Sequence, residues 1–172
     1  GAACVHGGRV YVGANSGRVY ALAADTGAVQ WSYATAGPVK GGVNLDPGTR
    51  RLYVPSYDNR LHCLAVDDPA GRPRWTFEAD GYINGAPALA GELVVFGSCD
   101  AALHVLDAAT GRRRQRIDTG AYIPGSPVLD LPWAWVGNYE GVFLCADVTT
   151  GAIRWPVASV RSTPSALSRT AR

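Results

Sequence analysis

Acidic residues recur at a regular interval along this chain of 172 residues. Asp58, Asp100 and Glu140 each stand in a short polar stretch between two apolar stretches, 42 and 40 residues apart. Carboxylates that meet at one place are ligands that Ca²⁺ prefers, so the three could form a calcium site. Asp is also favoured at turn tips, because its side chain bonds to the turn amides. We predict the second role, as turn tips in solvated loops.

Cysteine and histidine are the other residues that could bind a metal or undergo redox chemistry. No CxxC pair occurs, and the three histidines are not spaced to join cysteines in a zinc site. Two of the cysteines share one position of a repeated strand, where we predict small buried hydrophobic residues. Four cysteines permit two disulfides, and the redox compartment stays open: Cys4, Cys63, Cys99 and Cys145.

The elements that position these residues come from a fourfold internal repeat. Residues 137–155 read GNYEGVFLCADVTTGAIRW, and related phrases begin at Gly13, Pro55 and Gly97. The four starting positions are 42, 42 and 40 residues apart. Self-similarity at such a period indicates a solenoid, a propeller or an array.

Each repeat predicts four short β-strands. Stretches of β-branched and aromatic residues bounded by glycine indicate strands, and Asn15-Ser16-Gly17 indicates a hairpin turn. No window shows the sustained 3.6-residue period of a helix, so we expect an all-β chain. The strands expected in the first repeat are 9–13, 18–23, 29–34 and 39–45, and the later counterparts of the fourth are 83–89, 123–129 and 160–167.

Four antiparallel strands per period of ~40 residues match the blade of a β-propeller. The fourth stretches are rich in Gly, Ala and Pro, so we place them innermost, where strands crowd around the axis. The strands that carry Trp31, Trp75 and Trp155 are then outermost. The blades are expected at about 1–36, 37–80, 81–120 and 121–158, with 159–172 starting a further strand or closing the ring.

The phrase A-x-D-x-x-T-G-x-x-x-W is best seen at 146–155, and its first part recurs at 106–111. The units resemble the quinoprotein-type repeat of pyrroloquinoline-quinone (PQQ) dehydrogenases and of non-catalytic relatives such as the outer-membrane assembly lipoprotein, in which this phrase is the tryptophan-docking motif. The glycine supplies a positive φ, Asp and Thr bond to turn amides, and Trp packs between blades. Departures are Ala23 for Asp, an insertion at 67–70 and Gln115 for Trp. The matching residues are Trp31, Trp75, Trp155, Asp107, Thr110, Gly111, Asp147, Thr150 and Gly151.

The resemblance favours an open arc of a seven- or eight-blade wheel over a closed four-blade ring. In a closed ring, residues 163–167 would pair with 9–13. The chain contains no Met and opens inside a repeat. We therefore expect a fragment, with any secretion signal upstream and further blades of a parent protein as partners.

In the dehydrogenases, the resemblance would imply PQQ between a tryptophan floor and a vicinal disulfide, with calcium held by Glu, Asn and Asp. No two cysteines here are adjacent, and no Glu, Asn and Asp set matches the calcium ligands. We therefore expect no catalytic residue, cofactor or metal in this chain, with PQQ and calcium as the alternative.

The remaining candidate residues stand where the inner strands begin. Such positions from several blades converge on one mouth of a propeller channel, where polar residues could line a binding pocket. An unoccupied, solvent-filled mouth is the prediction for the isolated chain. The equivalent residues are Lys40, Asn84, Pro124 and Arg161, with Tyr82 and Tyr122 two residues before two of them.

We predict a non-enzymatic scaffold that binds a protein partner in the periplasm, at the outer membrane or outside the cell. A net charge of +2 implies no polyelectrolyte partner, and the arginines of 112–116 are expected on a solvated outer face rather than at a nucleic-acid site. No stretch approaches the ~18–20 apolar residues of a membrane span. The alternatives are a fragment of a PQQ-dependent dehydrogenase and a sensor domain of a kinase or another enzyme.

Overall fold

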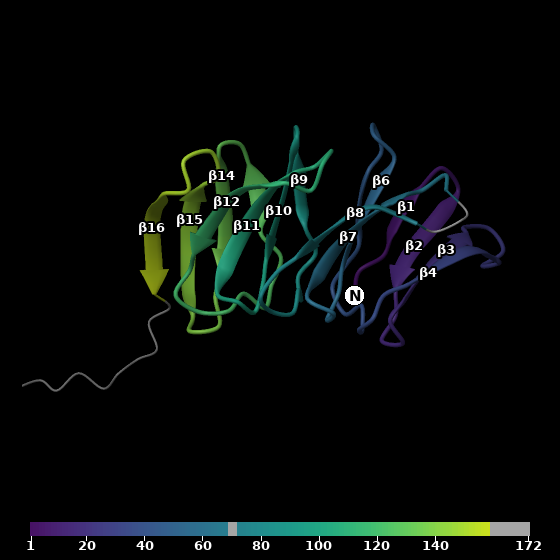
Figure 1. Ribbon diagram of the computed structural model, residues 1–172, viewed down its shortest axis with the longest axis horizontal. Helices are drawn as coiled ribbons and strands as arrows, with labels where there is room; N and C mark the ends of the chain where they lie inside the picture. Colours follow the sequence, from purple (N-terminus) through teal and green to yellow (C-terminus); the bar gives the residue numbers. More distant parts are fainter. Residues whose placement is uncertain (69–71, 159–172) are drawn as a thin grey trace, which may run out of the picture.

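The structure, a computed structural model, describes residues 1–68 and 72–158 and consists of four antiparallel sheets that follow one another along the chain (Figure 1). The predicted all-β class and the four-stranded blades are confirmed. The first sheet contains β1 (Cys4–His6), β2 (Arg9–Gly13), β3 (Arg18–Ala23) and β4 (Val29–Ala34), and the second contains β5 (Asn44–Asp46), β6 (Arg51–Pro55), β7 (Arg60–Ala65) and β8 (Pro73–Glu78). The third contains β9 (Ala88–Ala90), β10 (Leu93–Gly97), β11 (Ala102–Asp107) and β12 (Arg113–Asp118), and the fourth contains β13 (Val128–Asp130), β14 (Trp133–Gly137), β15 (Val142–Asp147) and β16 (Ile153–Ala158).

The strand register repeats from sheet to sheet. In the first sheet Tyr11 lies opposite Ala21, which lies opposite Trp31. The corresponding rows of the later sheets end in Trp75, Gln115 and Trp155, and each last pairing contains a bulge one residue beyond the row. The docking residue therefore occupies the same register position on the outermost strand of every sheet.

The sheets form an open arc, as predicted. Each inner strand contacts the next one, from β1 to β5, β9 and β13. The first and fourth sheets lie at opposite ends of the molecule (Figure 1). β1 occupies the edge of β2 that ring closure by residues 163–167 would require, and those residues lie outside the described part of the chain.

The prediction for the inner strands was wrong in its extent. Only the last residues of 39–45, 83–89 and 123–129 form strands, and each strand pairs with the hairpin that follows it. The preceding glycines instead bring the backbones of neighbouring blades together: a Cβ on Gly41 would lie 2.6 Å from the carbonyl oxygen of Asn84, and one on Gly85 would lie 2.1 Å from that of Gly125. These segments pack on the adjacent blade rather than extend a ladder.

The first strand predicted from the sequence was 9–13, whereas Cys4–His6 precedes it and forms the inner strand of the first sheet. This short strand lacks the Gly-Pro stretch that marks the others, so its sequence does not identify it. The corresponding stretch at 160–167 lies outside the described residues.

The hydrophobic core lies between sheets. Fully buried Tyr53 and Cys63 of the second sheet pack with Phe96 and Leu106 of the third. Two similar clusters join the first sheet to the second and the third to the fourth. Cys63 and Cys145 are buried in their strands, as expected. Since each sheet buries its faces only against its neighbours, the joints between blades supply the apolar burial that stabilises the fold.

The docking residues occupy these joints. Trp75 donates its indole N–H to the carbonyl of Ala108 at 3.2 Å, in the turn of the third sheet. Gln115 holds the equivalent place at the next joint, and its amide donates to the carbonyl of Thr149 at 3.0 Å. Trp31 is 8% exposed, whereas Trp155 at the end of the arc is 37% exposed.

The turns that receive these residues are built by their Asp, Thr and Gly. Asp107 Oδ1 accepts hydrogen bonds from the amides of Ala109 and Thr110 at 3.1 and 2.9 Å, and Gly111 has φ +71°. Hydrogen bonding from Arg114 and Thr110 holds the pKa of Asp107 at about 2. Asp147, Thr150 and Gly151 repeat this turn in the fourth sheet.

Comparing Gly111→Ala with Gly27→Ala isolates the docking contact. Both glycines have positive φ, but a Cβ on Gly111 would lie 2.6 Å from the Trp75 ring, while nothing lies within 4 Å at Gly27. Backbone strain is expected to cost about 1 kcal/mol at Gly27, and overpacking to raise the loss at Gly111 to about 3 kcal/mol or more. Denaturant unfolding measures both; equal losses would contradict a tight joint.

Candidate functional site

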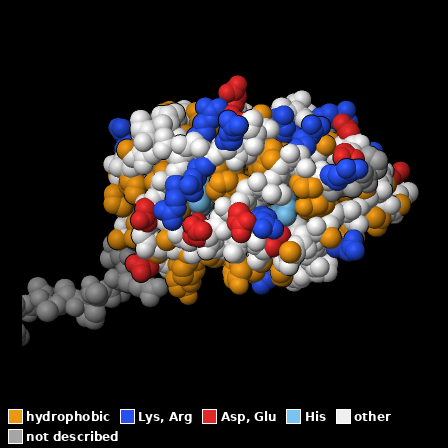
Figure 2. All heavy atoms as spheres, viewed as in Figure 1, with side chains coloured by type: hydrophobic (Ala, Val, Ile, Leu, Met, Phe, Trp, Pro, Cys, Tyr) orange, Lys and Arg blue, Asp and Glu red, His pale blue; other side chains and the backbone are white. Residues whose placement is uncertain are grey.

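One edge of the arc gathers all four hairpins between second and third strands, together with the crossings between sheets. We call it the hairpin face. It is the lower edge in Figure 1, where β16 ends, and Figure 2 shows hydrophobic side chains projecting from that edge. The hairpins are 14–17, 56–59, 98–101 and 138–141, and the crossings are 35–43, 79–87 and 119–127.

An aromatic stack lies where the second and third sheets meet on this face. The rings of Tyr57 and Tyr82 are parallel within 3°, with centroids 4.8 Å apart. The Lys40 ammonium lies 4.5 Å from the Tyr57 centroid, and the Tyr57 hydroxyl is hydrogen-bonded to Asn84. Tyr82 is 51% exposed, so the stack offers a broad aromatic surface beside a positive charge.

A second aromatic pair lies one joint further along. Tyr122 stacks on Tyr139 with centroids 4.2 Å apart, and Tyr139 is 62% exposed. Desolvation, together with a hydrogen bond to Tyr139, raises the pKa of Tyr122 to about 12, so this phenol stays neutral. The amide of Tyr139 donates to the carbonyl of Tyr122 at 2.9 Å, and that of Ile123 donates to the Ser98 carbonyl at 3.1 Å. The crossing is thus tied to hairpins on both sides.

The structure places the sequence-predicted residues in two groups. Lys40, Asn84 and Tyr82 meet around Tyr57, while Tyr122 belongs to the neighbouring pair. Arg161 lies outside the described residues. The hairpin tyrosines Tyr57 and Tyr139 were not among the binding residues predicted from the sequence. Each directly precedes an acidic hairpin residue, which is the signal that could have found them.

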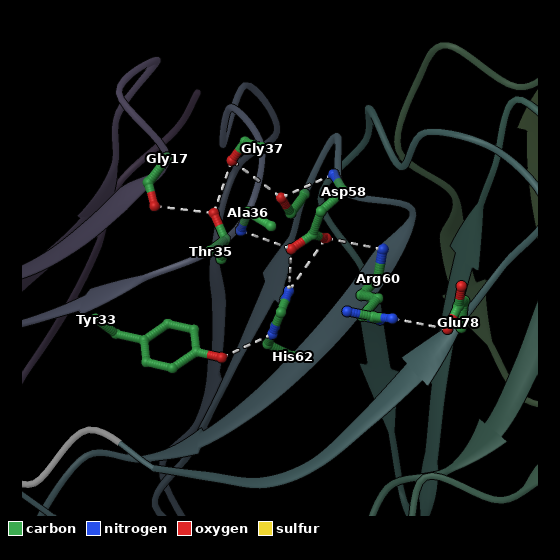
Figure 3. Close-up of polar contacts among 10 residues, drawn as sticks. Gly17, Tyr33, Thr35, Ala36, Gly37, Asp58, Arg60, His62 and Glu78 are labelled. Atoms are coloured by element: carbon green, nitrogen blue, oxygen red, sulfur yellow. Dashed lines mark hydrogen bonds and ion pairs between the residues drawn. The ribbon is translucent and has the colours of Figure 1, made fainter.

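Beneath this surface, the side chain of Asp58 is buried, which corrects its prediction as a solvated turn tip. Its side chain is 5% exposed, and its carboxylate lies 3.0 Å from Nε2 of His62 (Figure 3). The same carboxylate accepts hydrogen bonds from the backbone amides of Ala36 and Arg60, both at 3.0 Å. Asp58 therefore joins its own hairpin to the crossing from the first sheet.

The third sheet repeats the arrangement. Asp100 is 3% exposed and lies 2.9 Å from Nε2 of His104, and it accepts hydrogen bonds from Ala102 and Asp80 amides. The solvated-tip prediction was therefore wrong here too, whereas Glu140 in the fourth sheet is exposed. The repeated Asp-x-x-x-His spacing was present in the sequence, but it was not interpreted as a pair.

The two buried histidines differ at their second ring nitrogen. Nδ1 of His62 is hydrogen-bonded to the Tyr33 hydroxyl at 2.9 Å. Phe77 takes the place of Tyr33 at the next joint, 5.4 Å from His104 between ring centroids. Within residues 1–68 and 72–158, Nδ1 of His104 has no hydrogen-bond partner. Because Phe77 lacks the hydroxyl that Tyr33 has, this buried nitrogen stays without a hydrogen bond.

Burial sets the charge of both pairs. It lowers the pKa of His62 and His104, and the neighbouring aspartates offset this only in part. Burial alone would raise the pKa of Asp58 and Asp100, but the histidines and backbone amides outweigh it, so the net shift is downward. A neutral imidazole beside a carboxylate is thus the stable form near neutral pH. With exposures of 1–5%, the four side chains act as clamps that substrates do not reach.

The described residues contain no group of three or more His, Cys, Asp and Glu side chains placed to hold a metal ion. The carboxylates of Asp58 and Asp100, considered above as calcium ligands, are engaged by histidine and backbone amides. Burial raises the pKa of Cys63 to about 12, so its thiol stays protonated and unreactive. These residues do not fit a quinone and calcium centre.

Comparison with known proteins identifies similar chains. Residues 1–170 match the model of the family described as outer membrane protein assembly factor BamB. The crystal structure of BamB from Moraxella catarrhalis is similar with a TM-score of 0.76 and 25% identity, over 90% of this chain and 47% of that one. The computationally designed Ika8 protein matches with a TM-score of 0.79 and 15% identity, over 90% and 48%, and bears on the fold alone. The chain thus spans about half the length of these structures. A search of curated proteins finds no match.

Exchanging the residues at positions 33 and 77 tests the role of the tyrosine hydroxyl. Tyr33→Phe leaves Nδ1 of His62 unpaired and is expected to lower the free energy of unfolding by about 1 kcal/mol. Phe77→Tyr supplies the hydroxyl that His104 lacks and is expected to raise it by up to about 1 kcal/mol. Chemical denaturation measures both variants, and changes of the same sign would contradict the assignment.

Stability is expected to fall on acidification. Below the unfolded histidine pKa of about 6.5, the unfolded chain takes up protons that folded His62 and His104 resist, so stability falls toward their lowered folded pKa. A second loss follows below about pH 4, as Asp58 and Asp100 protonate. His62→Gln with His104→Gln should flatten the melting temperature between pH 7 and pH 5, and His6→Gln is the control for histidine removal. An unchanged slope in the double variant would refute this cause.

Proposed function

Since this chain belongs to the family of the outer membrane protein assembly factor BamB, we propose that it is a non-enzymatic scaffold that binds a protein partner through its hairpin face. The observation that carries the proposal is the exposed tyrosine surface. Tyr82 and Tyr139 are 51% and 62% exposed, yet each is held by a ring stack.

Rigid tyrosines suit protein recognition. Tyr offers a large contact area with few rotatable bonds, and aromatic residues are enriched at interfaces and their hot spots. Tyr82 is fixed by its stack on Tyr57 and by its carbonyl, which accepts the amide of Cys99 at 2.8 Å. Little side-chain entropy is therefore lost on binding.

The chemistry of the surface favours a partner segment that combines apolar and acidic side chains. The tyrosine rings and hydroxyls can bind apolar or hydrogen-bonding groups, and the exposed Lys40 adds one positive charge beside them. The overall charge of +2 supports no polyanionic partner.

The family, rather than the chain's own residues, supports an envelope location. The printed name of the family concerns outer membrane assembly, and the matched BamB structure is a relative of about twice the length. None of the described residues form a helix suited to crossing a bilayer. We propose a periplasmic or outer-membrane-associated position, reached through an anchor or partner.

Site-specific photocrosslinking tests the proposal. A crosslinker at Tyr82 or Tyr139 is expected to capture one partner from envelope extracts, whereas one at Glu92, which is 89% exposed on the opposite edge, is not. With the purified partner, Tyr57→Ala is expected to weaken binding about 10-fold, since it removes both the support of Tyr82 and the bond to Asn84. Equal capture from both edges would contradict a specific hairpin face. Oxidation of alcohols or sugars after addition of PQQ and Ca²⁺ would instead support the dehydrogenase alternative.

A further inference from the structure

The joint between the third and fourth sheets differs from the others in the side chains that fill it. Each sheet has a forward face, which carries Trp31, Trp75, Gln115 or Trp155, and a backward face, which receives the docking residue of the preceding sheet. The three joints between the described sheets, numbered along the chain, each bury a forward face against a backward face. In the third joint Gln115 takes the place of an indole.

The forward face of the third sheet lacks two aromatic rings that the other sheets have. Each of those sheets carries one ring at either end of the strand row that ends in the docking residue. The pairs are Tyr11 and Trp31, Tyr53 and Trp75, and Trp135 and Trp155. The third sheet has Val95 and Gln115 at the same positions. Small side chains in place of large ones leave a space that a ring of similar shape can fill.

A cleft of about 280 Å³ occupies this part of the third joint. Leu93, Arg114 and Gln115 line it from the third sheet, and Val148 and Thr149 line it from the turn of the fourth sheet. Val148 is buried in the core of the joint and Leu93 packs against that core, so the cleft has an apolar floor. Ligand pockets usually measure ~300–1,000 Å³, so a cleft of this volume fits one small ring system rather than a large cofactor.

Arg114 forms one wall of the cleft and is held in place. Its guanidinium is hydrogen-bonded to the carboxylate of Asp107. In the fourth sheet the corresponding arginine, Arg154, lies over the ring of Trp133, 4.8 Å from its centroid. Trp133 has the register position that Leu93 has in the third sheet. Since a guanidinium plane stacks well on an aromatic ring, Arg114 can cover a ring bound in the cleft.

The cleft also offers a hydrogen-bond acceptor. In the second joint the carbonyl of Ala108 accepts the indole N–H of Trp75 at 3.2 Å. Val148 has the place of Ala108 in the turn of the fourth sheet, but Gln115 donates to the carbonyl of Thr149 instead. Among the described residues no donor is bonded to the Val148 carbonyl. This carbonyl can therefore accept an N–H from a bound ring.

We propose that the third joint binds a small free molecule of the indole class, a flat aromatic ring system with one N–H donor. The apolar floor covers the ring, the Arg114 guanidinium stacks on it, and the Val148 carbonyl accepts its N–H. Asp107 and Glu92 offset the charge of Arg114, so the ligand needs no charge of its own. The exposed residues around the cleft, Thr149, Arg114 and Glu92, offer no apolar surface to a longer partner segment, which favours a free molecule. The cleft lies beside Glu92, on the edge opposite the hairpin face, so the site is independent of the proposed protein partner.

Titration of the isotope-labelled chain with indole, followed by NMR, tests the proposal. We expect the amide signals of Leu93, Gln115 and Thr149 to shift with one saturable dissociation constant on the order of 1 mM. N-methylindole, which lacks the N–H, should bind about 3-fold more weakly or less. Gln115→Trp places the chain's own indole in the joint and should abolish binding while raising the denaturant concentration at which the chain unfolds. Gln30→Trp, at an exposed position beside the docking residue of the first sheet, is the matched control and should bind indole like the parent chain.

Shifts that do not saturate, or that arise away from the cleft, overturn the proposal, and so does binding that survives Gln115→Trp. Equal affinity for N-methylindole excludes the Val148 carbonyl as acceptor and overturns the indole class. A tryptophan-containing peptide that binds more tightly than indole assigns the cleft to a protein partner and overturns the free ligand. None of these measurements involves the tyrosines of the hairpin face, so a failure here is distinct from a failure of the proposed function.

Discussion

The packing of a forward face on the next backward face is the interaction on which the rest of the structure depends. A single four-stranded sheet of this kind has no second layer of its own, and its apolar residues are covered only by the neighbouring sheets. Stability in such an array is a sum over units and joints. The identical register of all four sheets is what allows one joint geometry to recur.

Different side chains satisfy this one geometry. Trp75 fills its joint with an indole, whereas Gln115 reaches the next turn with an amide and covers less apolar area. A second position on the same strand face lies two residues after each docking residue. There Tyr33 contacts His62, Phe77 contacts His104, and Ile117 lies in one cluster with Leu144. At this second position the contacts thus run from polar to apolar along the arc, whereas at the docking position the third joint is the polar one. A polar joint specifies its partners by hydrogen bonds, and an apolar one by shape alone.

The sequence predicted the features that depend on local residues and failed for those that depend on two blades at once. The period, the hairpins and the Thr-Gly turns follow from turn chemistry and β-propensity within a few residues. The short inner strands, the burial of Asp58 and the stack of Tyr57 on Tyr82 depend on contacts across a joint. A turn-tip aspartate looks the same in a sequence whether water or the adjacent crossing covers it. Only the recurrence of Asp-x-x-x-His in consecutive repeats carried that information.

The division between buried clamps and exposed aromatics would allow this face, under the proposed function, to bind a partner without weakening the fold. Asp58 and Asp100 hold each hairpin to the crossing beside it from below, with side chains at most 5% exposed. Those bonds order the loops that carry the tyrosine stacks, so the exposed rings of Tyr82 and Tyr139 lie on a fixed backbone. The end faces are constrained differently: Trp155 and the Gly27 turn carry the residues of a blade joint. A surface built to that pattern is best covered by another sheet of the same repeat, whereas the hairpin edge carries exposed tyrosines that follow no such pattern.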